Sequence, residues 1–224
     1  MTLTPIVVMA SGRGSNFDAI LRAIQAGTLA AEIRAVISDK ADAPVLAKAK
    51  AAGLRAVTIA PESDANVSAQ ARRKNHEEAL LNELRSLTPK FLVMAGYMRI
   101  LSPHLIAHFH SEKGYSRIVN IHPSLLPSFP GVNGYAQAFQ YGSKATGVSV
   151  HLVNEEMDNG PILAQESFSI ADCESVEEVE ARGLAIEHRL FPETLAWVLP
   201  EHFRVEERLQ MAGSVKRRLC VRQD

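Results

Sequence analysis

The sequence predicts an α/β protein: a single domain built on a Rossmann-like, mostly parallel twisted sheet of about seven strands, with helices on both faces. Three observations support this fold class. Short apolar runs recur along the 224-residue chain, and their lengths favour strands over buried helices. Segments with helical patterns separate the runs, which is typical of strand–helix–strand crossover units. The first run leads at once into a glycine-containing turn and a helical pattern.

The expected elements alternate along the chain. Strands are predicted at residues 5–9, 33–37, 56–59, 91–95, 118–121 and 147–152. Helices are predicted at residues 16–25, 43–52, 68–86, 103–109 and 175–198, with loops at 60–68 and 109–116. We expect residues 1–200 to form the main domain and residues 201–224 to be a C-terminal extension that packs on it or trails from it. The basic run 216–218 in this extension is most often a solvated chain end.

Composition excludes several classes of function. The chain is 46% apolar and 22% charged, as in ordinary globular proteins, and its net charge of −1 gives no general attraction to nucleic acid or anionic membranes. Cys173 and Cys220 form neither a metal motif nor a disulfide framework. The N-terminus lacks the features of a signal peptide, and no apolar run is long enough to span a bilayer. We expect a cytoplasmic monomer or homodimer with small-molecule substrates, without metal, nucleic-acid or membrane partners.

The turn after the first strand has the character of an anion site. It consists of Gly12, Arg13, Gly14, Ser15 and Asn16. Glycines allow a ligand to approach the backbone, and the free N–H groups of a helix start favour negative charge. We expect Ser15 or Asn16 to cap the helix. Phe17 replaces the third glycine of a dinucleotide fingerprint, and no P-loop Lys follows. A tight turn without a ligand is the alternative, but Arg13 favours phosphate because a guanidinium can pair with it through two hydrogen bonds.

The predicted strand at 118–121 ends in two polar side chains. Because alternate side chains of a strand share a face, Asn120 and His122 point the same way, whereas Val119 and Ile121 point into apolar packing. Pro123 then stops the strand pairing. Open α/β sheets bind ligands at such carboxyl ends. An amide N–H and a protonated imidazole suit acyl transfer, because both donate to the oxygen that becomes negative when an amine attacks a carbonyl. A purely structural Asn/His pair is the alternative.

A candidate carboxylate follows the strand predicted at 147–152. Asp158 begins an Asp-Asn-Gly-Pro segment that is typical of a turn, where Asp is common for local reasons alone. A carboxylate beside His122 would stabilise the imidazolium and orient the ring. The sequence does not show whether the two side chains meet.

Several segments together resemble one known family. They are residues 11–16, 95–103, 120–127 and 157–161, and the pair Glu187-His188 ahead of Phe191-Pro192. In order and spacing, from about residue 6 to residue 197, the chain resembles the phosphoribosylglycinamide formyltransferases. The Asn-x-His-Pro-Ser-Leu-Leu-Pro pattern at 120–127 is specific to folate-dependent formyltransferases and their hydrolase relatives.

The resemblance implies a reaction and a set of residues. The reaction is transfer of the formyl group of 10-formyltetrahydrofolate, a co-substrate, to the amine of 5'-phosphoribosylglycinamide in purine biosynthesis, without a metal. The implied catalytic residues are Asn120, His122 and Asp158. The implied substrate-binding residues are Gly12, Arg13, Gly14, Ser15, Asn16, Pro123 and Glu187. The implied folate-binding residues are Arg73, Met98, Arg99, Ile100, Leu101, Asn120, Asn154, Glu155, Glu156, Met157 and Asp158. A cis Leu126–Pro127 bond is also implied.

The chain departs from the family pattern at three places. Residues 111–115 resemble a small insertion, which we expect to lengthen a surface loop only. Leu184 stands where relatives often have Lys or Gln near the phosphate, so we expect Arg13 to compensate. Asn133 stands where many bacterial relatives carry histidine, which affects a secondary contact.

Three rival functions share parts of this pattern. Formyltetrahydrofolate hydrolase, the nearest alternative, shares the three catalytic residues, but its members usually read His-His-Ser-Phe-Leu-Pro and carry an N-terminal regulatory domain. Methionyl-tRNA formyltransferase needs a further C-terminal domain and a basic surface. A non-catalytic phosphate-binding module would leave the aligned Asn, His and Asp without a purpose. The amine-dependent transferase is therefore the function that the sequence favours.

Overall fold

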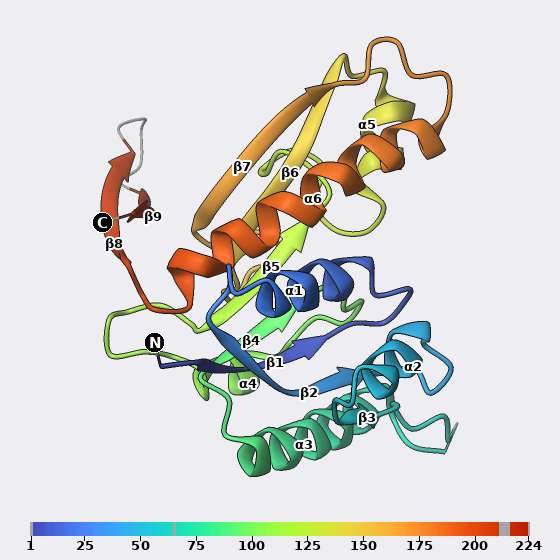
Figure 1. The fold of residues 1–224 in the computed structure, drawn as a ribbon, viewed down its shortest axis with the longest axis vertical. Coiled ribbons are helices and arrows are strands. Elements are labelled where there is room, and N and C mark those ends of the chain that lie inside the picture. Colours follow the sequence, from blue (N-terminus) through green and yellow to red (C-terminus); the bar gives the residue numbers. More distant parts are fainter. Residues whose placement is uncertain (1, 65, 211–215, 224) are drawn as a thin grey trace.

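The central feature of the computed structural model is one seven-stranded sheet (Figure 1). The structure describes residues 2–64, 66–210 and 216–223. In sequence order the strands are β1 (Thr4–Met9), β2 (Ala31–Ser38), β3 (Ala56–Thr58), β4 (Phe91–Met94), β5 (Ile118–His122), β6 (Ala145–Leu152) and β7 (Ile162–Ser169). Their spatial order is β3-β2-β1-β4-β5-β6-β7, with neighbours parallel from β3 to β5 and antiparallel from β5 to β7. The fold class predicted from the sequence is confirmed.

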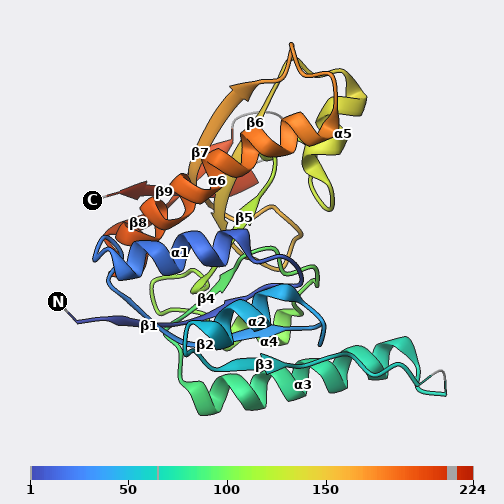
Figure 2. The same cartoon turned by 45° about the vertical axis from the view of Figure 1, so that its right-hand side comes forward.

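Helices cover both faces of the sheet (Figures 1 and 2). They are α1 (Ser15–Gln25), α2 (Pro44–Ala51), α3 (Ala69–Leu87), α4 (Pro103–Ala107), α5 (Gly134–Tyr141) and α6 (Val176–Val198). Side chains of α1, α2, α5 and α6 join one apolar cluster, and side chains of α3 and α4 join the other. Among the described helices, none combines the length and apolar character that crossing a membrane requires.

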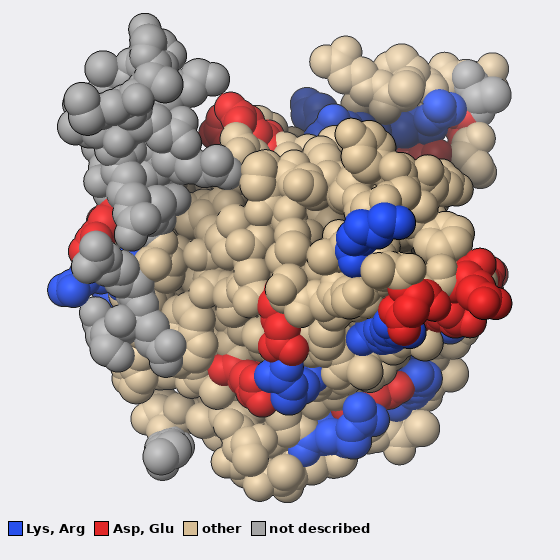
Figure 3. All heavy atoms as spheres, turned by 90° about the horizontal axis from the view of Figure 1, so that it is seen from above, with Lys and Arg blue, Asp and Glu red and all other residues tan. Residues whose placement is uncertain are grey.

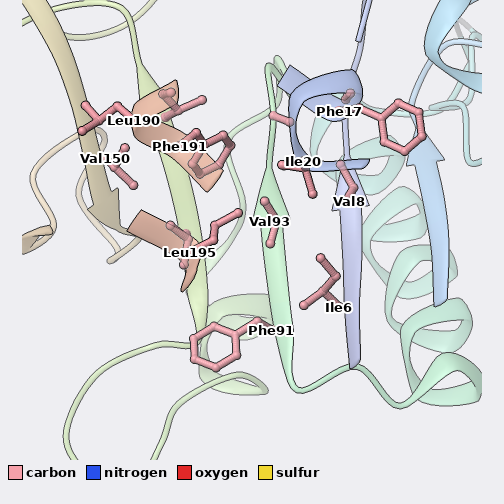
Figure 4. Close-up of a cluster of buried hydrophobic side chains, with 14 of the residues drawn as sticks. Ile6, Val8, Phe17, Ile20, Phe91, Val93, Val150, Leu190, Phe191 and Leu195 are labelled. Carbon is pink, nitrogen blue, oxygen red and sulfur yellow. The ribbon is translucent and has the colours of Figure 1, made fainter. Parts of the chain in front are cut away.

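The central strands are buried on both faces. In β1, Ile6 and Val8 enter the cluster with α1 and α6, whereas Val7 and Met9 enter the opposite one, and all four side chains are fully buried. Figure 4 shows Ile6 and Val8 facing Ile20 of α1. Such two-sided burial is typical of parallel strands and holds their carboxyl ends rigidly at one edge.

Two elements between residues 1 and 200 are absent from the sequence-based prediction. They are α5 and β7. In β7 the burial pattern shows partly and fully exposed residues along its whole length, because this strand lies at the edge of the sheet and has no long apolar run. The predicted cis bond between Leu126 and Pro127 is present.

The C-terminal extension forms a hairpin of β8 (Phe203–Gln210) and β9 (Lys216–Gln223). Phe203 is 2% exposed and packs against Tyr115 and Trp197. The basic run 216–218 lies in β9, and its side chains are outside the described part of the structure.

The expectation that residues 111–115 only lengthen a surface loop is wrong. Tyr115 is 3% exposed, and its hydroxyl donates a hydrogen bond to Glu201 over 2.9 Å. Glu201 also pairs with Lys90 at 2.8 Å and Arg117 at 2.9 Å. Burial alone would raise the pKa of Glu201, but these three donors outweigh it and lower the pKa to about 2. The insertion therefore joins the start of the C-terminal extension to the base of the sheet.

Charged side chains of both signs are interspersed on the face seen in Figure 3. This agrees with the formal net charge of −1. Binding of a phosphate must therefore depend on local geometry rather than on a broad field of one sign.

Candidate active site

Strand β5 presents Asn120 and His122 on one face, as the sequence predicts. Val119 and Ile121 pack in the cluster with α1 and α6, on the opposite face. His122 is 3% exposed, whereas Asn120 is only partly buried and lines a cavity beside it. Both side chains therefore stand at the carboxyl end of a parallel strand, where open α/β sheets bind ligands.

Both ring nitrogens of His122 face hydrogen-bond acceptors. Nε2 lies 2.9 Å from the carbonyl oxygen of Phe129, to which it donates. Nδ1 lies 3.5 Å from Oδ2 of Asp158, which also accepts a 2.7 Å hydrogen bond from the backbone N–H of Gly131. Because carbonyl and carboxylate oxygens only accept, the surroundings of His122 fit a ring that carries a proton on each nitrogen.

The turn that carries Asp158 depends on glycine two residues later. A Cβ atom on Gly160 would come within 1.7 Å of the carbonyl oxygen of Leu152, so only glycine lets the chain return this closely along the end of β6. Asp158 itself has a φ of 52°, in the left-handed region where Asp is among the better tolerated residues. The Asp-Asn-Gly-Pro segment thus turns the carboxylate back toward β5.

His151 is a site residue that the sequence analysis missed. It lies directly opposite Asn120 in the antiparallel pairing of β5 and β6. Its Nδ1 donates to the carbonyl of Leu152 at 2.9 Å, so Nε2 of the neutral ring accepts from the Asn120 amide at 3.1 Å. Burial lowers the pKa of His151, which keeps that ring neutral. A histidine inside a buried apolar strand was the available signal, but only the strand register shows its partner.

One amide proton of Asn120 is therefore committed to His151, and the other remains for a ligand. Oδ1 of Asp158 lies 3.7 Å from Nε2 of His151, beyond hydrogen-bond distance. The arrangement holds an amide donor, an imidazole and a carboxylate along one wall of a cavity. Their chemistry suits a reaction in which negative charge develops on a carbonyl oxygen.

The glycine turn forms a second cavity. Helix α1 begins at Ser15, with Gly14 as its N-cap at a φ of 74° and no side chain capping it. The prediction that Ser15 or Asn16 caps the helix is therefore wrong, and the first-turn N–H groups keep no side-chain partner. A Cβ atom on Gly14 would come within 2.5 Å of Val45, so this turn requires glycine for space as well as for φ.

The second cavity contains the residues predicted to bind the amine substrate. Its lining includes Gly12, Arg13, Gly14, Ser15, Asn16, Pro123 and Glu187. Leu184 lines the same cavity, and Arg13 is exposed at the turn; that Arg13 compensates for the missing cation at 184 stays a prediction. Buried Glu187 accepts hydrogen bonds from the Asn16 amide at 2.7 Å and from the hydroxyl of Tyr135 at 2.7 Å.

The first cavity gathers most of the predicted folate-binding residues. Its lining includes Met98, Arg99, Ile100, Leu101, Asn120, His122, Asn154, Glu155, Glu156, Met157 and Asp158. Arg73 lies outside it: Nη2 is 3.4 Å from the carbonyl oxygen of Ile100, and Arg73 lines two other cavities, both shared with Arg99. Arg73 therefore reaches the outer side of the wall formed by residues 98–101.

The two cavities adjoin at the ends of β4 and β5. Gly96, Met98, Ile121, Pro123 and Asn133 line both. Ser11, which precedes the glycine turn, holds the chain at Met98 in place: its hydroxyl accepts a hydrogen bond from the backbone N–H of Met98 at 2.9 Å and donates one to Asp39 at 2.5 Å. Ligands in the two cavities would meet beside Asn120 and His122.

Comparison with known proteins identifies the family of this chain. Residues 4–195 match the family model described as formyl transferase. The chain belongs to this family. Among curated relatives of this formyl transferase, phosphoribosylglycinamide formyltransferase of Escherichia coli (strain K12) is 36% identical over 202 residues, which is 90% of each chain.

The chain is also similar to solved structures of enzymes named for this reaction. The chain resembles glycinamide ribonucleotide transformylase 1 from Symbiobacterium toebii with a TM-score of 0.82 and 33% identity, over 99% of this chain and 94% of that one. A formyltetrahydrofolate deformylase from Pseudomonas syringae pv. tomato has a TM-score of 0.79 at 24% identity, over 92% of this formyl transferase and 64% of that chain. At that identity the likeness shows the fold alone.

Proposed function

We propose that this chain transfers the formyl group of 10-formyltetrahydrofolate to the amine of 5'-phosphoribosylglycinamide, giving formylglycinamide ribonucleotide and tetrahydrofolate in purine biosynthesis. One observation carries the proposal: the cavity at the glycine turn and the cavity at residues 98–101 meet beside Asn120, His122 and Asp158. The relatives named for this reaction, matched over nine-tenths of the chain, support it.

The anion end of the amine substrate fits the glycine turn. The phosphate would accept hydrogen bonds from the uncapped N–H groups at the start of α1, with Arg13 beside them. The aminoacyl end would then extend along the cavity toward Glu187 and Pro123. This leaves the amine at the junction with the folate cavity.

The chemical step needs an oxyanion site and a route for one proton. As the amine nitrogen forms a bond to the formyl carbon, the second amide proton of Asn120 donates to the developing oxyanion, and the positive charge of the protonated His122 ring in the same cavity stabilises it. Asp158 balances the charge of the ring from 3.5 Å. When the bond from carbon to the folate N10 breaks, the proton lost by the amine is transferred to N10. Holding both substrates together supplies much of the rate, up to about 7–11 kcal/mol in favourable cases.

An absorbance assay of tetrahydrofolate formation tests the proposal. We expect turnover of 10-formyltetrahydrofolate only when 5'-phosphoribosylglycinamide is present, with formylglycinamide ribonucleotide as the second product. Equal turnover without the amine would instead identify a hydrolase, because water would then be the acceptor.

The remaining expectations from the sequence stay predictions. They are the boundary between a catalytic domain at 1–200 and an extension at 201–224, the cytoplasmic location, and the monomeric or homodimeric state. Size-exclusion chromatography with light scattering would measure the last of these.

A further inference from the structure

Tyr135 occupies a position between α5 and α6 that no described function explains. It is 5% exposed, and its ring packs at 6.0 Å between centroids against Phe168 of β7. A Cβ atom on Gly183 would come within 2.2 Å of the Tyr135 ring and hydroxyl. Helix α6 therefore carries glycine where the tyrosine passes, and the hydroxyl is directed onto Glu187, one helical turn further along α6.

Glu187 is a buried carboxylate held by neutral donors. Oε1 accepts from the Tyr135 hydroxyl and Oε2 accepts from the Asn16 amide, both at 2.7 Å. Within the described residues no Lys, Arg or His forms an ion pair with it, although it is only 6% exposed. A buried charge of this kind is costly unless something else compensates it. Because Glu187 lines the substrate cavity, the compensating group can come from a ligand.

A second acceptor in the same wall lacks a partner. Oδ1 of Asn16 is buried and has no hydrogen-bond partner, while Nδ2 of the same amide is held by Glu187. Asn16 is 7% exposed and lines the same cavity. The wall thus contains one unpaired amide oxygen beside one carboxylate. Such a pair is suited to a ligand group rich in N–H donors, such as an amine or amide.

We propose that Tyr135 is a positioning residue for the amine substrate. Its hydroxyl fixes the rotamer of Glu187, and Glu187 in turn fixes the orientation of the Asn16 amide, so that both acceptors face the N–H groups of the substrate. This inference rests on the proposed function, because it takes the amine substrate to occupy this cavity. Burial, and after it the neighbouring Glu187, raise the pKa of Tyr135, so the hydroxyl remains a donor at neutral pH.

Tyr135→Phe is the direct test, because it removes the hydroxyl and keeps the ring against Gly183. Tyr141→Phe is the matched control: Tyr141 lies on the same helix and is 81% exposed. A hydrogen bond to a charged group is typically strong enough that its loss costs about tenfold or more in affinity. We expect the KM for 5'-phosphoribosylglycinamide to rise about tenfold in Tyr135→Phe, with the KM for the folate donor within twofold of wild type. Tyr141→Phe should match wild type in both.

Two further measurements separate positioning from a merely structural role. Isothermal titration of 5'-phosphoribosylglycinamide into each protein, without folate, should show the same loss of affinity in Tyr135→Phe. In a Glu187→Gln background, adding Tyr135→Phe should cause little further loss, because the carboxylate that it orients is already gone. Thermal unfolding confirms that each variant is folded.

The outcomes are distinguishable. A folded Tyr135→Phe protein with unchanged KM and Kd for the amine substrate overturns the inference, as does an equal rise in KM for both substrates or full additivity with Glu187→Gln. If the wild-type protein neither binds nor formylates 5'-phosphoribosylglycinamide, the proposed function itself fails, whatever Tyr135 does.

Discussion

Asp158→Asn isolates the charge of the carboxylate from its hydrogen bonds. An asparagine oxygen in the place of Oδ2 can still accept from Gly131 and still face Nδ1 of His122, which are 2.7 Å and 3.5 Å away in the native protein. For unit charges 3.5 Å apart, an effective dielectric constant of about 20 gives roughly 5 kcal/mol. The side chain of Asp158 is 12% exposed, so water screens part of this interaction. We therefore expect about 3–4 kcal/mol of lost transition-state stabilisation, which corresponds to a fall in kcat of roughly 10²- to 10³-fold.

The absorbance assay of tetrahydrofolate formation, with both substrates varied, measures this loss. The KM values should change little, because the charge supports the protonated ring in the transition state rather than the binding of either substrate. Asp158→Ala, which also removes the bond to Gly131, should be at least as slow. A folded Asp158→Asn enzyme with kcat within about threefold of wild type would refute the electrostatic role.

Three further predictions follow from individual contacts. Glu201→Gln should destabilise the protein by about 1–3 kcal/mol at pH 7, because the mutant loses the negative charge that Lys90 and Arg117 stabilise in the folded state. The native pKa of Glu201 is lowered from 4.5 to about 2, so this stabilisation is present above pH 4.5 and is lost as the pH falls from 4.5 toward 2. The free energies of unfolding of the two proteins, measured by urea titration, should therefore converge at acid pH. His151→Phe should lower kcat by roughly 10- to 100-fold in the same absorbance assay, because the Asn120 amide loses its acceptor; an unchanged kcat would contradict this. Gly14→Ala should cost at least about 1–2 kcal/mol in chemical denaturation, whereas Gly12→Ala, whose added Cβ meets nothing within 4 Å, should cost clearly less.

The strand ends could be predicted because they depend on local pattern. Apolar runs bounded by glycine or proline mark β1 and β5, and alternation along β5 correctly places Asn120 and His122 on one face. The anion turn was recognisable because glycines between a strand and a helix indicate close backbone approach. Each of these features depends only on residues that lie within a few positions of one another in the sequence.

The errors share a different cause. The insertion at 111–115 is polar enough to resemble a free loop, yet Tyr115 becomes buried because Glu201 and Phe203 approach from the other end of the chain. The helix cap was misassigned because the helix begins directly after Gly14, so Ser15 and Asn16 lie within its first turn; Val45, from α2, packs where a side chain on residue 14 would stand. In both cases a distant segment outweighs the local preference.

By itself the sequence determined the fold class, the order of its main elements and the residue types that carry the chemistry. Only the tertiary structure decided which of them touch. His151 joins Asn120 through the register of β5 and β6, Asp158 reaches His122 because Gly160 permits a backbone approach, and Glu187 meets Asn16 across 171 residues of chain. The physical reason is that such contacts follow from packing of the whole core, whereas periodicity and turn chemistry report only the chain on either side of a residue.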